Sequence, residues 1–116
     1  MSFRVSCHCG AIKSEISGEQ PTKAMSCNCS ICRRKGSLMH FIATDAFSLE
    51  TSRAAIGVYT FRTHNIKHEF CRTCGCAPFG EGTAPDGKAM VAINLRCAEE
   101  VDLSKLEIIE FDGASV

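Results

Sequence analysis

Two short stretches, Cys7-His8-Cys9 and Cys71-Arg72-Thr73-Cys74, determine the fold expected for this chain of 116 residues. Two cysteines separated by one or two residues can both face one metal ion, because the backbone between them bends around it. Together the two pairs supply four thiolates, which complete the tetrahedral shell of a structural zinc ion. We therefore expect Cys7, Cys9, Cys71 and Cys74 to hold a closed zinc site that joins the N-terminal strand to a distant hairpin.

A third group of cysteines lies between these two pairs, in the stretch Cys27-Asn28-Cys29-Ser30-Ile31-Cys32. Three thiolates on one zinc ion leave a fourth position for water or for a substrate sulfur, as in reactive zinc sites. The sequence therefore predicts a second, catalytic zinc site at Cys27, Cys29 and Cys32. Spacing alone also allows another grouping, in which Cys27 and either Cys29 or Cys32 join Cys71 and Cys74.

Length and composition indicate one zinc-stabilised domain over residues 1–116. The hydrophobic share of 45% includes nine cysteines, and the chain has no Trp, so the core should be modest and metal should supplement it. The formal net charge is zero, which argues against a nucleic-acid partner. A homo-oligomer is compatible with this composition.

The N-terminal residues contain no apolar run long enough for a signal peptide, and no other run approaches the length of a membrane helix. We therefore expect a cytoplasmic protein that does not bind membranes, in a compartment where thiols stay reduced. The odd number of cysteines and the strain of a disulfide within Cys7-His8-Cys9 also favour metal binding over disulfides.

The remaining pattern is typical of a mainly β protein with little helix. Segments 47–50, 57–62 and 66–71 alternate between apolar and polar residues, as half-buried strands do. Segments 11–16 and 106–111 are further strands, 37–43 is expected to be a buried strand and 89–95 a central one. Ser30 to Lys35 is expected to form one helical turn, and the stretch 81–88, which contains Asp86-Gly87, a turn.

The cysteine motifs and several later stretches resemble the glutathione-dependent formaldehyde-activating enzyme (GFA) family, which also includes centromere protein V. The matching stretches occur in the same order over nearly the whole chain: Cys7-His8-Cys9-Gly10, Cys27 to Gly36, Tyr59-Thr60-Phe61, His68 to Gly75, Asn94 to Cys97 and Phe111-Asp112-Gly113. The resemblance implies a β-tent fold of small antiparallel sheets, shared with a Rab-binding chaperone and with type B methionine sulfoxide reductases. It also implies the grouping of zinc ligands given first above.

By this resemblance the protein is a zinc-dependent carbon–sulfur lyase, active in formaldehyde detoxification. Its substrates would be a small thiol such as glutathione and a small aldehyde, joined or released as S-(hydroxymethyl)glutathione. The basic stretch Arg33-Arg34-Lys35 follows the central cysteines and could bind the carboxylates of glutathione through charge-assisted hydrogen bonds. A solvated turn is an equally good interpretation of these three residues.

A few residues depart from the family pattern or lie outside the metal scheme. Asn28 stands where many members have His; it is not a ligand, so the change bears on substrate contacts. Cys76 and Cys97 are expected to be inert, partly buried side chains. His8 should point away from the metal, whereas His68 could donate a hydrogen bond to a sulfur.

Two other functional classes remain open from the sequence. One is a non-catalytic zinc-binding module for a protein or nucleic-acid partner. The other is a type B sulfoxide reductase, which would use two CxxC pairs for zinc and a late catalytic cysteine. The first pair here is CxC, and Cys97, the late cysteine, has no suitable motif around it.

Overall fold

Strands are the main regular structure in the computed structural model, which describes residues 1–116, so the prediction of a mainly β protein is confirmed. The single α-helix is the turn expected after the central cysteines. The elements are β1 (Ser2–Ser6), β2 (Lys13–Ser17), β3 (Lys23–Cys27), α1 (Cys32–Lys35), β4 (Met39–Ala43), β5 (Phe47–Leu49), β6 (Ile56–Tyr59), β7 (Lys67–Cys71), β8 (Phe79–Thr83), β9 (Ala89–Asn94) and β10 (Glu107–Phe111), with five short 3-10 turns.

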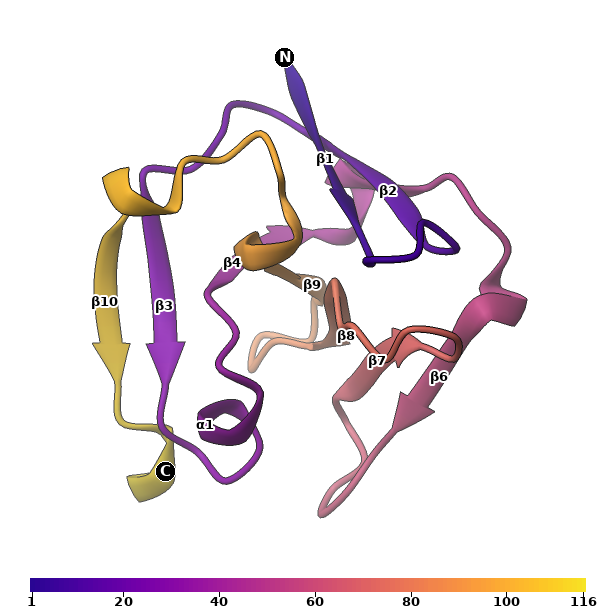
Figure 1. The fold of residues 1–116 in the computed structure, drawn as a ribbon. Coiled ribbons are helices and arrows are strands. Elements are labelled where there is room, and N and C mark those ends of the chain that lie inside the picture. Colours follow the sequence, from indigo (N-terminus) through magenta and orange to yellow (C-terminus); the bar gives the residue numbers. More distant parts are fainter.

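The strands form two sheets, one of three strands in the order β1-β2-β5 and one of seven in the order β10-β3-β4-β9-β8-β7-β6. Figure 1 shows β1 and β2 above the larger sheet, with β3 and β10 at one side and β6 at the other. β9 is an interior strand, as its apolar sequence predicts. None of the helices is long and apolar enough to cross a membrane.

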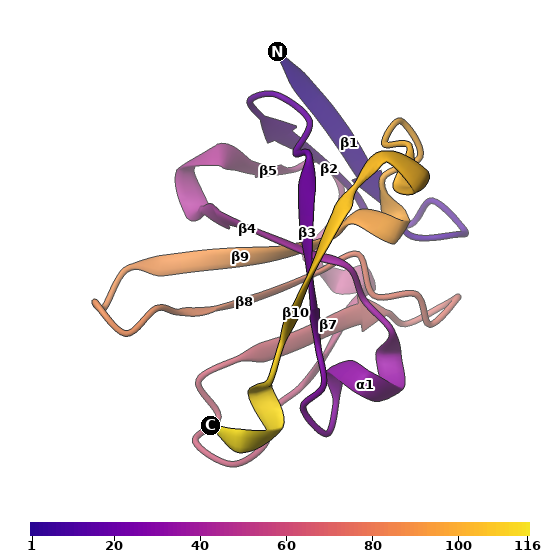
Figure 2. The same ribbon diagram turned by 90° about the vertical axis from the view of Figure 1, so that its left-hand side faces the viewer.

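All neighbouring strands are antiparallel except β10 and β3, which run parallel with Glu107 beside Lys23 and Phe111 beside Cys27. This parallel pair is a difference from the antiparallel sheets that the resemblance implies. After β9 the chain passes through two 3-10 turns, Leu95–Cys97 and Leu103–Lys105, before β10 starts beside β3. Figure 1 shows β10 beside β3, and in Figure 2 β10 lies in front of β3 and leads to a C-terminal turn near α1.

The core lies between the two sheets and consists of alternate residues of their strands. Phe3 and Val5 of β1, Ile16 of β2, and Val91 and Ile93 of β9 are almost fully buried. Because side chains of a strand point alternately to opposite faces, each strand contributes only its inward residues. Cys7 and Cys71 belong to the same core cluster of 15 buried residues. Each of the two outer cysteine motifs therefore contributes one cysteine to the core.

The segment predicted as a buried strand, 37–43, contains β4, but this strand is only half-buried and Phe41 is 45% exposed. The prediction of burial is therefore wrong. Met39 and Phe41 lie on one face of β4 and line a pocket, so their apolar character serves a cavity wall rather than the core.

Candidate functional site

Four cysteines from the two outer motifs converge on one point between the sheets. Cys7 and Cys9 follow β1, Cys71 ends β7, and Cys74 lies in the next turn, with all four Sγ atoms within 4.8 Å of one another. The Sγ atoms of Cys7 and Cys9 are 3.7 Å apart, and those of Cys9 and Cys71 are 3.6 Å apart. Zinc–sulfur bonds in a tetrahedron place sulfurs about 3.8 Å apart, so this cluster fits a zinc ion.

Backbone amides surround the same sulfurs. Ile12 N–H donates to Cys7 Sγ at 3.3 Å, and the N–H groups of Thr73 and Cys74 donate to Cys71 Sγ at 3.4 Å. Gly75 adopts a φ of 78°, which lets the chain turn tightly after Cys74. Such donors stabilise thiolates. Backbone N–H groups of Cys76 and then Cys9 lower the pKa of Cys74 to about 5.

The three central cysteines form a second cluster at the other end of the larger sheet. Cys27 ends β3, Cys29 lies in the following turn and Cys32 begins α1, and their Sγ atoms lie within 4.8 Å of one another. Cys29 N–H donates to Cys27 Sγ at 3.5 Å. No fourth Cys, His, Asp or Glu joins the cluster. The donor set fits a zinc ion with one open position.

The electrostatics of this cluster also suit a cation. Burial, and then the neighbouring thiols of Cys29 and Cys27, raise the pKa of Cys32 to about 12. Without a cation the ionisation of Cys32 is therefore disfavoured. A bound metal ion reverses this, because its charge favours the thiolate form of every ligand.

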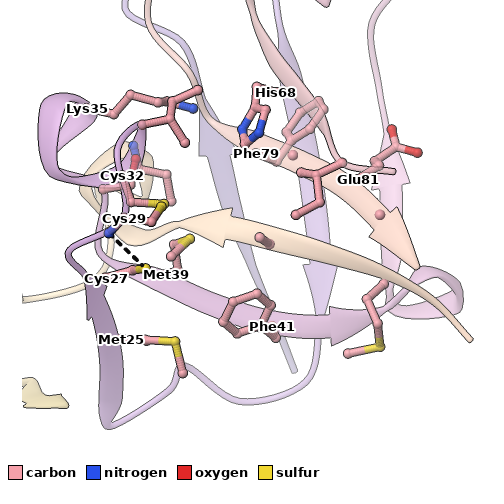
Figure 3. A pocket seen from close by; sticks show the side chains of 18 of the residues that line it. Met25, Cys27, Cys29, Cys32, Lys35, Met39, Phe41, His68, Phe79 and Glu81 are labelled. Atoms are coloured by element: carbon pink, nitrogen blue, oxygen red, sulfur yellow. Dashed lines mark hydrogen bonds between the residues drawn. The ribbon is translucent and has the colours of Figure 1, made fainter. Parts of the chain in front are cut away.

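The three-cysteine cluster opens into a pocket of about 520 Å³. Cys27, Cys29 and Cys32 all line it, and 15 of its 24 lining residues are hydrophobic. In Figure 3 the three cysteines and Lys35 lie on one side of the pocket, Glu81 lies on the opposite side, and Phe41 and Phe79 lie between them. A cavity of this size is typical of small-molecule sites.

Besides the three cysteines, three ionisable side chains line the pocket: Lys35, His68 and Glu81. Glu81 forms an ion pair of 2.9 Å with Arg53. Lys35 has no acidic partner, and desolvation lowers its pKa although the side chain remains accessible at the rim. Burial, and then the charge of Lys35, lower the pKa of His68, so the imidazole is neutral at pH 7. Lys35 is therefore the one unpaired cation of this wall.

The structure separates the three basic residues predicted to bind carboxylates. Lys35 lines the pocket, whereas Arg33 and Arg34 are exposed and lie outside it. The Arg34 guanidinium donates to the carbonyl oxygen of Ser30 at 2.7 Å, which fixes it on its own turn. Carboxylate binding by Arg33 and Arg34 stays a prediction, and Lys35 is the residue with the position for it.

Cys76 and Cys97 join neither cluster and pack against the core. Burial raises the pKa of Cys97 to about 11, which keeps its thiol protonated and unreactive. His8 is exposed, as expected for a side chain between two ligands. His68 lies in the pocket wall, and no hydrogen bond joins it to a sulfur of either cluster.

The C-terminal turn lies against the three-cysteine cluster, a contact that sequence reasoning missed. Asn28 Nδ2 donates to Asp112 Oδ1 at 3.0 Å, and Ala114 N–H donates to Asn28 Oδ1 at 2.9 Å. Gly113 is thereby held so close that a Cβ built on it would lie 2.4 Å from Cys27 Sγ. Asn28 and Asp112-Gly113 were both visible as polar or turn-forming residues in the sequence. Their contact could not be predicted, because they are more than 80 residues apart.

Comparison with known proteins agrees with this arrangement. The chain is similar to a Rhodobacter sphaeroides protein of known crystal structure, with 27% sequence identity and a TM-score of 0.80 over 93% of this chain and 99% of that one. The model of one family, "Glutathione-dependent formaldehyde-activating enzyme", matches residues 2–108. Because this match spans most of the chain and includes both cysteine clusters, the protein belongs to the glutathione-dependent formaldehyde-activating enzyme family.

Proposed function

We propose that the protein is a zinc-dependent carbon–sulfur lyase that forms or cleaves the adduct of a small thiol, such as glutathione, with a small aldehyde. The observation that supports this most directly is the cluster of Cys27, Cys29 and Cys32, which provides three thiolates and opens into a pocket. The family supports the substrates, since its name refers to glutathione and formaldehyde. Nine free cysteines suit a reducing compartment, so we propose the cytoplasm as the location.

The two clusters divide the work in this proposal. Cys7, Cys9, Cys71 and Cys74 have no open position and hold a structural zinc ion. Cys27, Cys29 and Cys32 hold the reactive one, which when bound lowers the pKa of a fourth, substrate thiol. Their combined negative charge makes the site a weak Lewis acid toward carbonyls, so it suits presentation of a thiolate better than activation of water.

Cleavage of the adduct breaks the carbon–sulfur bond, and its electron pair leaves with the sulfur. The adduct hydroxyl loses its proton as the aldehyde C=O forms, and the thiol regains a proton on release. Lys35 orients the substrate by pairing with a carboxylate of the thiol. His68, neutral at pH 7, offers a hydrogen-bonding nitrogen in the same wall.

The test follows the exchange between glutathione, formaldehyde and S-(hydroxymethyl)glutathione by NMR, with zinc-loaded protein. We expect the wild-type protein to accelerate the exchange and Cys29→Ser to return it to the uncatalysed rate. Lys35→Met should raise KM about tenfold, because a charge-assisted pair is lost, with kcat little changed. Lys105→Met is the matched control and should behave as wild type, because Lys105 is exposed and lies outside the pocket.

Two results would contradict the proposal. One is the absence of any acceleration by wild-type protein that contains two zinc ions per chain. The other is equal acceleration by wild-type protein and Cys29→Ser, which would place the reaction outside the three-cysteine cluster.

A further inference from the structure

We infer that the pocket selects adducts whose aldehyde portion is apolar and larger than formaldehyde, namely hemithioacetals of a small thiol with an aliphatic or aromatic aldehyde. The inference rests on the proposed function, because it places the adduct sulfur at the three-cysteine cluster. It then assigns the remaining space of the pocket to a substituent on the reacting carbon.

The size of the pocket is the first observation. Formaldehyde contributes a single carbon to the adduct, whereas the cavity measures about 520 Å³ and extends from the cysteines across β4 and β9 to β8. An adduct of formaldehyde would leave this apolar space to water. A longer aldehyde chain would fill this space, and both the chain and the apolar pocket wall would then be removed from solvent.

The chemistry of the wall is the second observation. Phe41, Ile66 and Phe111 are each more than 40% exposed, yet all three line this pocket. Large apolar side chains gathered on the surface mark a binding site more often than an accident of folding. Met25, Met39 and Met90 complete the wall, and their flexible thioethers adapt to ligands of varied shape.

The distribution of charge is the third observation. Lys35, on the same side as the cysteines, is the unpaired cation, while Glu81 on the opposite side is neutralised by Arg53. The remainder of the pocket has no charge with which the ammonium or second carboxylate of glutathione could pair. We therefore place the charged portion of the thiol at the rim near Lys35 and the apolar substituent in the interior.

The reaction is unchanged by this assignment. The carbon–sulfur bond breaks, its electron pair stays on sulfur, the hydroxyl proton is lost and the sulfur regains one, so the products are the thiol and the longer aldehyde. No oxidant or reductant is required.

The test uses stable thioethers, so that binding is measured without catalysis. Zinc-loaded protein labelled with ¹³C in its methionine methyl groups is titrated with S-methylglutathione and S-hexylglutathione. The chain has four methionines, of which three line the pocket and Met1 does not. We expect S-hexylglutathione to bind at least about tenfold more tightly. The signals of Met25, Met39 and Met90 should shift, and that of Met1 should not.

Matched variants locate the effect. Ile66→Ala and Phe41→Ala should weaken binding of S-hexylglutathione several-fold and leave S-methylglutathione unaffected, because only the longer chain reaches these side chains. Ile108→Ala is the control, since Ile108 is similarly exposed on β10 but lies outside the pocket. Equal affinity for the two thioethers, or tighter binding of the longer one without shifts of the three pocket methionines, would overturn the inference.

An activity measurement separates this inference from the proposed function. Hexanal release from its glutathione hemithioacetal should show a higher kcat/KM than formaldehyde release from S-(hydroxymethyl)glutathione. Equal or lower kcat/KM for hexanal would overturn the inference alone. Absence of turnover with both adducts would contradict the proposed function, while the thioether titration would still decide the nature of the pocket.

Discussion

At the scale of single residues, Gly113 is a position with no room for a side chain. Its backbone lies against the sulfur of Cys27, and a Cβ there would also lie 3.3 Å from the Cβ of Cys29. The hydrogen bonds of Asn28 to Asp112 and Ala114 prevent the turn from moving away. The turn therefore holds Cys27, the first ligand of the proposed reactive zinc site, in place.

We predict that Gly113→Ala weakens zinc binding at the three-cysteine cluster by about 10- to 100-fold, the usual effect of disturbing groups that position metal ligands. The four-cysteine site serves as the internal control, because it lies away from this turn and should keep its metal. Competition with a zinc chelator measures both affinities in one sample. An unchanged zinc affinity at the three-cysteine cluster would show that the turn does not position Cys27.

The pH dependence of stability has a residue-scale contribution from His40. Burial lowers the pKa of His40 below its ordinary value of 6.5. As the pH falls below 6.5, the unfolded chain therefore binds a proton at His40 more readily than the folded protein does. The contribution of His40 to stability is present above pH 6.5 and is lost as the pH falls through the pKa of the folded state. We predict that the free energy of unfolding decreases less from pH 7.5 to pH 5.5 in His40→Gln than in wild type. Urea denaturation at the two pH values measures this, and parallel decreases would contradict it.

The grouping of the candidate metal ligands was predictable from the sequence, because it depends on local spacing. All seven predicted ligands lie in the two clusters, because short cysteine motifs bend around one point whatever the surrounding fold. Lys35 reaches the pocket whereas Arg33 and Arg34 do not, because successive residues of a helix point about 100° apart and three in a row cannot face the same side. The contacts of Asn28 with the C-terminal turn depend on β10 lying beside β3, which spacing cannot reveal.

At the scale of elements, the four-cysteine cluster joins the turn between β1 and β2 to the end of β7, and so links the smaller sheet to the larger one. The three-cysteine cluster joins only the end of β3 to α1, which are adjacent in sequence. Loss of a long-range link should cost far more stability than loss of a local one, since it frees two sheets rather than one turn.

We accordingly predict that Cys74→Ser lowers the free energy of unfolding by more than about 3 kcal/mol and loses its β-sheet signal in circular dichroism. Cys29→Ser and Cys32→Ser should each lose one zinc ion and the activity while keeping that signal. Equal loss of sheet signal in both kinds of variant would contradict this division between a structural and a reactive site.

The strands themselves were predicted where they alternate or are strongly apolar. The predicted segments 57–62, 66–71 and 89–95 correspond to β6, β7 and β9. β3 and β8 were not predicted, because Lys23–Cys27 has mixed polarity and Phe79–Thr83 contains two glycines, which are poor strand formers. Both are formed by pairing with neighbours in the larger sheet, a property of the tertiary structure.

At the scale of the whole molecule, the fold combines a small core with a four-cysteine cluster and with a three-cysteine cluster beside an apolar pocket. Only 20 of 116 residues are buried, so little apolar burial is available to hold the sheets together. Two cysteines of the four-cysteine cluster, Cys7 and Cys71, belong to this core, whereas the three-cysteine cluster lines the pocket. The central claim is that the two clusters differ in their coordination of zinc. The four-cysteine cluster leaves no ligand position open, whereas the three-cysteine cluster leaves one open.

Titration of the cobalt-substituted protein with glutathione tests this claim most directly, because cobalt reports its thiolate ligands through its visible absorption. For the wild-type protein we predict two cobalt ions per chain and a spectral change that saturates at one glutathione per chain. Cys29→Ser should retain one cobalt ion, and its spectrum should not change with glutathione. A single cobalt ion per wild-type chain, or two ions whose spectrum glutathione does not change, would contradict the account.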